Sequence, residues 1–228
     1  MSETDSAMVP SKSPNPNSPT EAPTREETAL LPLFEGLPLH RIHVPKTKAE
    51  CESAAEQILA AGRAGFDTEA KPTFRVGEKS GGPHVVQFAL DEEAFIFQLH
   101  RPDCLRICAW LIGSERVIKV GFGLKNDHTQ IRSRLGVTPN GILDLDHVFR
   151  KKGYRRQIGV RGAMAAVLNL RLVKSKAITT SNWAATDLTP QQLRYAANDA
   201  FAALVILKAL DLPTSELLPA PTGRGRET

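Results

Sequence analysis

The sequence has few cysteines and no long apolar run, and each shortage excludes a class of protein. It contains three cysteines in 228 residues, and Cys104 and Cys108 lie one turn apart in an expected helix, so no disulfide framework is indicated. No run approaches the roughly 18 apolar residues of a membrane span, and the N-terminus lacks the apolar core of a signal peptide. We therefore expect an intracellular protein, cytoplasmic or, in a eukaryotic cell, nuclear.

Length and composition favour one globular domain with a tail at each end. A chain of this length with 41% hydrophobic residues can bury one sizeable core. Residues 1–25 hold thirteen Pro, Ser or Thr residues without apolar periodicity, which is typical of disorder. We predict a disordered leader over residues 1–35, a domain over 36–212 and a flexible tail over 213–228. The net charge of +4 suits a polyanionic partner without identifying one.

Apolar periodicity and capping signals predict an α/β fold with a mixed sheet. The expected elements are a strand over 41–45, a helix over 47–61, strands over 65–70, 84–90 and 94–99, a helix over 102–113, a strand over 117–122 and a helix from 189 to about 210. Both the first and the last helix begin with a capping-box pattern. Short connections between the strands from 65 to 99 indicate an antiparallel meander.

Two carboxylates share one face of the strand that contains Phe66-Asp67-Thr68-Glu69. Side chains alternate between the faces of a strand, so Asp67 and Glu69 point the same way. Two acids on one face of an apolar strand are costly unless a positive charge lies between them. A solvent-facing strand end is the alternative, because an isolated Asp-x-Glu is common.

Three further residues extend this set. Tyr195 and Asp199 are four residues apart and so share one face of the last helix, where neighbouring alanines leave room for close packing. A solvated Asp beside a half-buried Tyr is the alternative. Asp127 follows the apolar strand over 117–122, and there the alternative is a helix cap.

The order and spacing of these pieces resemble the DEDDy branch of the 3′-to-5′ exonucleases. The resemblance runs from about Arg41 to Leu210, with Phe66–Glu69, Gly121–Ile131 and Leu188–Ala200 similar to the family's three motifs. A tyrosine four residues before the last Asp is typical of this branch. Ser181-Asn182-Trp183 is closer to the Werner syndrome exonuclease domain than to ribonuclease D.

The resemblance implies a ribonuclease H-like fold, with a mixed sheet of five to six strands flanked by helices in a single domain. It also implies two Mg²⁺ or Mn²⁺ ions held by Asp67, Glu69, Asp127 and Asp199, with Tyr195 orienting the nucleophilic water. Hard oxygen ligands suit these ions, and two of them about 3.5–4 Å apart stabilise the attacking and leaving oxygens of a phosphodiester displacement. The implied products are nucleoside 5′-monophosphates.

A basic stretch between the second and third motifs predicts contact with the nucleic acid. From residue 150 to 176 nine residues are basic and none is acidic. The candidate substrate-binding residues are Lys151, Lys152, Arg155, Arg156, Lys174, Lys176 and Trp183. A solvated face is the alternative for the charges, and packing is the alternative to base stacking for Trp183.

The expected partner is therefore a nucleic acid with a single-stranded or recessed 3′ end, and DNA is favoured over RNA. Two other hypotheses remain open at this point. One is a 3′-to-5′ exoribonuclease of the ribonuclease D type, because recognition of a 2′-hydroxyl depends on local geometry. The other is a nucleic-acid-binding domain without catalytic activity.

Overall fold

A mixed sheet forms the centre of the molecule in the computed structural model, which describes residues 20–73, 77 and 80–213. Its six strands lie in the order β1-β4-β3-β2-β5-β6. The strands are β1 (Ile42–His43), β2 (Arg63–Glu69), β3 (Val85–Ala89), β4 (Ala94–Gln98), β5 (Ile118–Gly121) and β6 (Ile142–Asp144). The predicted α/β class with a mixed sheet is confirmed.

Strand directions follow the lengths of the connections. The pairs β2–β3 and β3–β4 are antiparallel, as the predicted meander requires. The pairs β1–β4, β2–β5 and β5–β6 are parallel and are joined through helices. The predicted strand over 41–45 shortens to Ile42–His43, because Pro45 offers no N–H to a further ladder bond.

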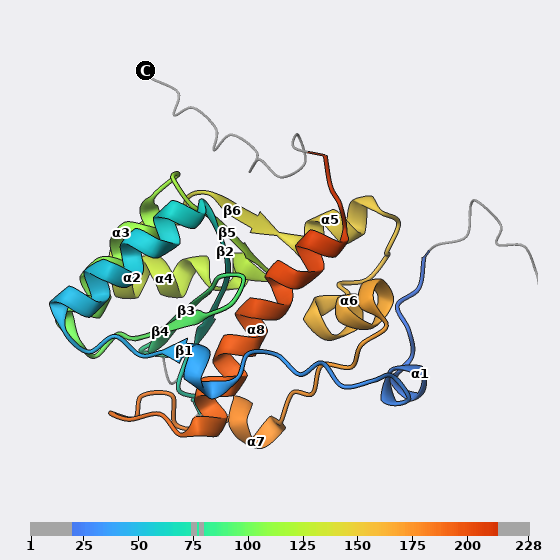
Figure 1. The fold of residues 1–228 in the computed structure, drawn as a ribbon, viewed down its shortest axis with the longest axis horizontal. Coiled ribbons are helices and arrows are strands. Elements are labelled where there is room, and N and C mark those ends of the chain that lie inside the picture. The colour runs from blue at the N-terminus through green and yellow to red at the C-terminus, as the bar shows by residue number, and fades with distance from the viewer. Residues whose placement is uncertain (1–19, 74–76, 78–79, 214–228) are drawn as a thin grey trace, which may run out of the picture.

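Helices cover both faces of the sheet. They are α1 (Arg25–Ala29), α2 (Lys48–Ala61), α3 (Pro102–Gly113), α4 (His128–Leu135), α5 (Leu145–Lys151), α6 (Gly159–Leu168), α7 (Lys176–Thr179) and α8 (Pro190–Ala209), with short 3₁₀ turns at Leu39–Arg41 and Leu124–Asn126. Figure 1 shows α8 crossing in front of the sheet, between α2 and α3 on one side and α5 and α6 on the other. Among the described residues, none of these helices has the length and apolar content needed to cross a membrane.

Two apolar layers fix the sheet between its helices. On one face, Phe66, Phe88 and Phe97 pack with buried residues of α2, α3 and α4. On the other face, apolar residues of β3 and β4 pack under the alanines of α8. Gly65 allows this close approach, since a Cβ there would lie 1.9 Å from the carbonyl oxygen of Ala200. The strand that carries Asp67 and the helix that carries Asp199 are thereby brought together.

The predicted disordered leader, residues 1–35, is corrected for its second half. Residues 20–35 contain α1, which begins with a capping box between Thr24 and Glu27. The Phe34 amide donates to the Arg171 carbonyl (3.0 Å), and the Arg171 amide donates to the Pro32 carbonyl (2.7 Å). Composition could not predict this path, because its partners are distant in sequence. Residues 1–19, and the predicted tail apart from Pro213, lie outside the described residues.

Candidate active site

The carboxyl end of β2 presents the first two acids of the site. Phe66 is 1% exposed and faces the aromatic core layer, so the alternating side chains of Asp67 and Glu69 face the α8 side of the sheet. The predicted shared face is therefore present. Both acids are partly buried, which distinguishes them from the carboxylates of a solvated strand end.

Helix α8 supplies the third acid. Thr189 and Gln192 form the predicted capping box, and Pro190 occupies the first turn. Asp199 lies two turns further along and is only 5% exposed. Asp67, Glu69 and Asp199 each offer an oxygen atom, and these atoms all lie within 4.8 Å of one another. Residues 130 positions apart in the sequence thus form one cluster of carboxylates.

Asp127 lies beside this cluster rather than inside it. It occupies the N-cap position of α4, but its side chain makes no capping hydrogen bond, so the helix-cap alternative does not explain the residue. Burial and the nearby charge of Asp67 raise the pKa of Asp127 to about 7. The charge of Asp127 interacts with those of Asp67 and Glu69, although its oxygens are not among those within 4.8 Å of one another.

The cluster carries more negative charge than its surroundings neutralise. Burial, followed by the charges of Asp67 and Asp199, raises the pKa of Glu69 to about 9. Burial raises the pKa of Asp199 to about 7 and also raises the pKa of Asp67. Ionised carboxylates that are buried together are stable only with a cation between them. Carboxylate oxygens with uncompensated negative charge fit hard divalent cations such as Mg²⁺ or Mn²⁺.

Lys174 is the one predicted substrate-binding residue that reaches the acids. Its Nζ atom lies 2.7 Å from Oδ2 of Asp199 and 5.5 Å from the ring centre of Tyr195. Burial opposes its charge, but Asp199 and Asp67 outweigh burial and raise the pKa of Lys174. Together with Asp67, Asp199 and Phe122, this lysine lines a pocket, which we call the acid pocket. One ammonium group offsets only part of the charge of the acids.

Tyr195 lies one turn before Asp199 and is held from two sides. Its hydroxyl forms a 2.8 Å hydrogen bond with the hydroxyl of Thr179, and its ring lies 5.9 Å from the ring of Trp183. Burial and the charge of Asp199 raise the pKa of Tyr195 to about 12. The phenol therefore keeps its proton near neutral pH and is suited to positioning a water molecule rather than to acting as a base.

The prediction that Trp183 stacks on a base is wrong. The side chain is 1% exposed, and its indole Nε1 donates to the Thr179 carbonyl (3.2 Å). It packs with the apolar layer under α8. The packing alternative is correct for this residue, and its ring lies beside that of Tyr195.

The other predicted substrate-binding residues lie outside the acid pocket. Lys151 ends α5, Lys152, Arg155 and Arg156 follow it, and Lys176 begins α7; all of them are exposed. None lines the acid pocket, although Arg155 and Arg156 line a neighbouring hollow. Contact with substrate stays a prediction for these five residues.

Gln87 is a buried polar residue next to the acids on the sheet that sequence patterns did not single out. It is fully buried on β3 and stands directly opposite Asp67 in the sheet register. Neither its amide nitrogen nor its amide oxygen has a hydrogen-bond partner among the described residues. The sequence does contain a sign of it, a glutamine inside the apolar run Val85-Val86-Gln87-Phe88. An unpaired buried amide is costly, so a glutamine kept at a buried strand position indicates a specific role.

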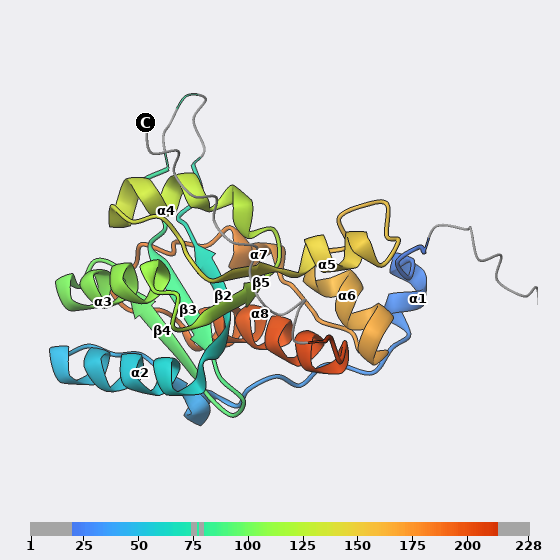
Figure 2. The ribbon, with the colours of Figure 1, turned by 90° about the horizontal axis from the view of Figure 1, so that it is seen from above.

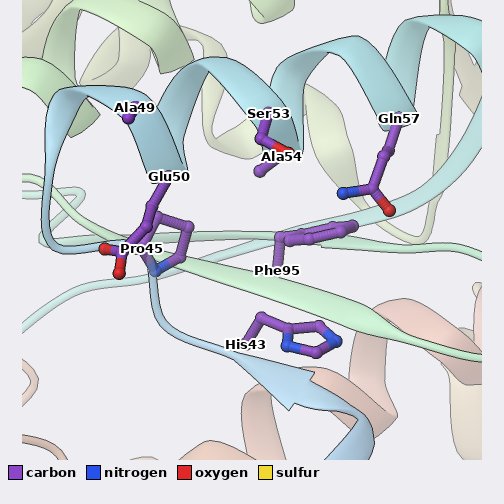
Figure 3. Close-up of a pocket in the computed structure, with 8 residues that line it drawn as sticks. All are labelled: His43, Pro45, Ala49, Glu50, Ser53, Ala54, Gln57 and Phe95. Atoms are coloured by element: carbon purple, nitrogen blue, oxygen red, sulfur yellow. The ribbon is translucent and has the colours of Figure 1, made fainter.

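A second hollow, between α2 and β1, offers no comparable chemistry. Figure 3 shows the ring of Phe95 between the side chains of α2 and the ring of His43. His43 Nε2 lies 2.9 Å from Oε2 of Glu93, and Glu50 accepts hydrogen bonds from the amides of Lys46 and Thr47. The ionisable groups here, those of His43 and Glu50, are thus engaged in local structure.

A family model described as 3′-5′ exonuclease matches residues 42–213 of the chain. The chain belongs to the 3′-5′ exonuclease family. The match includes β2, the turn that carries Asp127, and α8, so all four acids and Tyr195 lie within the exonuclease domain. The family relationship predicted from the three motifs is confirmed.

Two curated proteins show how far the sequence similarity extends. A 3′-5′ exonuclease of Arabidopsis thaliana is 31% identical over 76% of this chain and 65% of its own length. The bifunctional 3′-5′ exonuclease/ATP-dependent helicase WRN of Mus musculus is 29% identical over 64% of this chain and 11% of its own length. The chain therefore spans less than two thirds of these relatives.

Solved structures share the fold at lower identity. The EXO domain of Aedes aegypti Nibbler matches with a TM-score of 0.66 and 22% identity, covering 81% of this chain and 92% of that domain. RNase D of Trypanosoma brucei in complex with RNA U12 matches with a TM-score of 0.65 and 21% identity, covering 82% of this chain and 64% of that chain. This fold is the predicted one.

Proposed function

We propose that the exonuclease domain removes nucleotides one at a time from the 3′ end of a nucleic acid and releases nucleoside 5′-monophosphates. The observation that carries the proposal is the approach of Asp67, Glu69 and Asp199 to within 4.8 Å, with Asp127 beside them. These side chains come from a strand, a strand-to-helix turn and a helix of the matched domain.

In this proposal the acids hold two divalent ions, Mg²⁺ or Mn²⁺. The bound ions would activate a water molecule and stabilise the charge that develops on the leaving oxygen. Asp67, Glu69 and Asp199 supply the inner ligands, and Asp127 supports them from beside the cluster. Tyr195 orients the attacking water through its protonated hydroxyl, while Lys174 helps to keep Asp199 ionised through their ion pair.

DNA is the substrate that we favour, and RNA is the alternative. The resemblance of Ser181-Asn182-Trp183 to the Werner-type domain pointed to DNA. In the structure, however, Ser181 accepts a hydrogen bond from the Gln192 side chain (2.9 Å), and Trp183 is buried. The side chains of Ser181 and Trp183 are therefore engaged within the fold between α7 and α8. The structural similarity to an RNase D that was solved with RNA keeps the exoribonuclease hypothesis as the second candidate.

A panel of 5′-labelled substrates tests both hypotheses. Single-stranded DNA, recessed duplex DNA and RNA are each incubated with Mg²⁺ or Mn²⁺ and with wild type or Asp67→Ala. We expect a ladder of products shortened from the 3′ end, fastest on DNA and absent for Asp67→Ala. A ladder that survives this substitution would place the activity elsewhere, and binding without shortening would support the non-catalytic hypothesis.

A further inference from the structure

The segment over residues 20–34, which we call the N-terminal arm, lies against the basic stretch over residues 150–176. Thr20 forms an isolated bridge with Tyr154, and Leu33 forms one with Arg171. The ring of Phe34 stacks on Phe201 of α8, with their centres 5.9 Å apart. The arm is thus attached at both ends, and Figure 2 shows α1 beside α6 at the end of the molecule away from α2.

Between the arm and α6 lies a hollow that we call the arm groove. Pro23, Arg25 and Thr28 line its arm side, and residues 158–162 with Lys174 line its other side. Gly159, Val160 and Lys174 also line the acid pocket. A further hollow, which we call the outer hollow, is lined by residues 20–22 and 154–158 and shares Ile158 with the groove. The three hollows therefore adjoin one another between the arm and the acids, and we call this row of hollows the path.

The lining of this path is strongly cationic. Arg25 on the arm and Arg161 on α6 lie on its two sides, and Arg155 and Arg156 line the outer hollow. Within the part of the chain that the structure describes, none of these four arginines takes part in a salt bridge. Four arginines without acidic partners along one groove are a footprint expected for phosphates.

Acidic groups along the path are few, and most of them are engaged. At its inner end, Asp146 accepts hydrogen bonds from the Gln157 side chain (2.6 Å) and the Gly159 amide (3.0 Å). On α1, Glu27 accepts from the Thr24 amide (2.8 Å) in the helix cap. Glu21 is the acid that lines the outer hollow. Glu26 follows Arg25 on α1 but is not among the residues that line the groove, so the four lining arginines outnumber the acids of the groove and the outer hollow and favour an anion there.

We propose that the N-terminal arm forms one wall of a nucleic-acid-binding groove, in which Arg25 and Arg161 contact phosphates of the substrate strand on its way to the acid pocket. The inference rests on the proposed function, because it assigns the groove to the strand whose 3′ end reaches the acids. It also gives a role to residues that composition had marked as a disordered leader.

The test compares two double variants with the same change in charge. Arg25→Ala/Arg161→Ala removes one arginine side chain from each wall of the groove. Arg63→Ala/Arg116→Ala is the control. Arg63 begins β2 and Arg116 precedes the parallel β5, so both lie at the ends of these strands opposite the acids. Binding of labelled single-stranded oligonucleotides is measured by fluorescence anisotropy over a series of salt concentrations, with EDTA present to prevent cleavage.

We expect the groove variant to bind a long oligonucleotide at least about tenfold more weakly, because two charge-assisted contacts are lost. Its slope of log affinity against log salt concentration should fall by about 1.4, since each phosphate contact on a single strand contributes about 0.7. A trinucleotide should be affected much less. The control variant should keep the wild-type affinity and slope.

Several outcomes would overturn the inference: equal losses in both double variants, unchanged binding in the groove variant, or tighter binding, which would make the arm an obstruction. Melting temperatures of both variants verify that they fold. Because binding is measured without turnover, the two proposals fail separately. Asp67-dependent digestion with unchanged groove binding would reject the groove alone, and groove-dependent binding without digestion would reject the exonuclease activity alone.

Discussion

Two buried charged sites in the same sheet differ in how their charges are satisfied. Lys119 on β5 is fully buried, and its ammonium group donates to the carbonyls of Leu111 (3.2 Å) and Ser114 (2.6 Å) at the end of α3. Burial lowers the pKa of Lys119 to about 8. The acids at the end of β2 have Lys174 as their cation, and burial raises the pKa of each of them.

The difference separates a structural charge from a functional one. The Ser114 carbonyl needs a donor, and the Leu111 carbonyl accepts from Lys119 as well as from the Ser114 amide, so Lys119 and the end of α3 satisfy each other within the fold. The acids repel one another, and their charge calls for a cation from outside the chain. Substitutions at the lysine should therefore change stability, whereas substitutions at the acids should change activity.

The largest expected effect is the loss of activity in Asp199→Asn. One ligand oxygen and one charge disappear, and loss of even a partner of a metal ligand typically costs about 10- to 100-fold, so kcat should fall by at least about 100-fold. The melting temperature in EDTA should not fall, because relief of burial and of repulsion by Asp67 outweighs loss of the ion pair with Lys174, as the raised pKa of Asp199 implies. Kinetics and thermal unfolding of the same preparation check both parts. Full activity would exclude Asp199 from the site.

Lys119→Met should show the opposite behaviour. The Ser114 carbonyl loses its donor, whereas the Leu111 carbonyl keeps the Ser114 amide (3.3 Å), and a buried polar group left without a partner costs about 1–3 kcal/mol. We expect the melting temperature to fall by about 2–4 °C for each kcal/mol, with kcat unchanged well below the transition. A fall in kcat at constant melting temperature would contradict the distinction between the two sites.

Sequence patterns predicted the parts of the fold and site that depend on neighbours along the chain. The capping boxes at Thr47 and Thr189 marked the starts of α2 and α8, and alternation along β2 placed Asp67 and Glu69 on one face. Such features can be predicted from the sequence because they depend only on residues a few positions apart in a helix or strand. Family motifs then supplied the long-range pairing with Asp199.

Features that depend on distant partners were not predictable in this way. The burial of Trp183 results from packing against Tyr195 and strands of the sheet, and an isolated tryptophan in a sequence carries no sign of it. The N-terminal arm is held by Arg171, and the segment after it by Asn198, whose Oδ1 accepts from the Leu37 amide (2.9 Å) across 161 positions. The Pro-, Ser- and Thr-rich composition of residues 1–25 suggested the opposite.

The pH dependence of stability should distinguish Glu69 from an ordinary surface acid. Its pKa is about 9 in the folded protein against 4.5 for an unperturbed carboxyl group, so the folded state binds its proton more tightly. That contribution to stability is complete below about pH 4.5 and is lost as the pH rises to about 9.

In EDTA we therefore expect the melting temperature of wild type to fall between about pH 5 and pH 9. The melting temperature of Glu69→Gln should fall less over the same range. At about pH 9 the variant should be the more stable by about 1 kcal/mol or more, which corresponds to about 2–4 °C. Added Mg²⁺ should reduce the difference by stabilising wild type, because ligands must be deprotonated to bind a metal. Parallel curves for the two proteins would show that Glu69 is not buried as described.

The smallest effect, and the finest test of the comparison, concerns Gln87. Its buried amide has no protein partner among the described residues, so Gln87→Met, which keeps the volume, should leave stability unchanged or raise it by up to about 1 kcal/mol. Opposite residues of neighbouring strands have Cβ atoms about 4.5–5.5 Å apart, which brings this amide within reach of Asp67.

Loss of that donor should lower kcat several-fold and leave KM unchanged. The matched control is Ile96→Leu, one position further along the same cross-strand row, where a volume-conserving change should cost less than about 1.5 kcal/mol and no activity. A variant that is less stable but fully active would make Gln87 a structural residue like Lys119. A variant that is at least as stable but slower would place it with the acids.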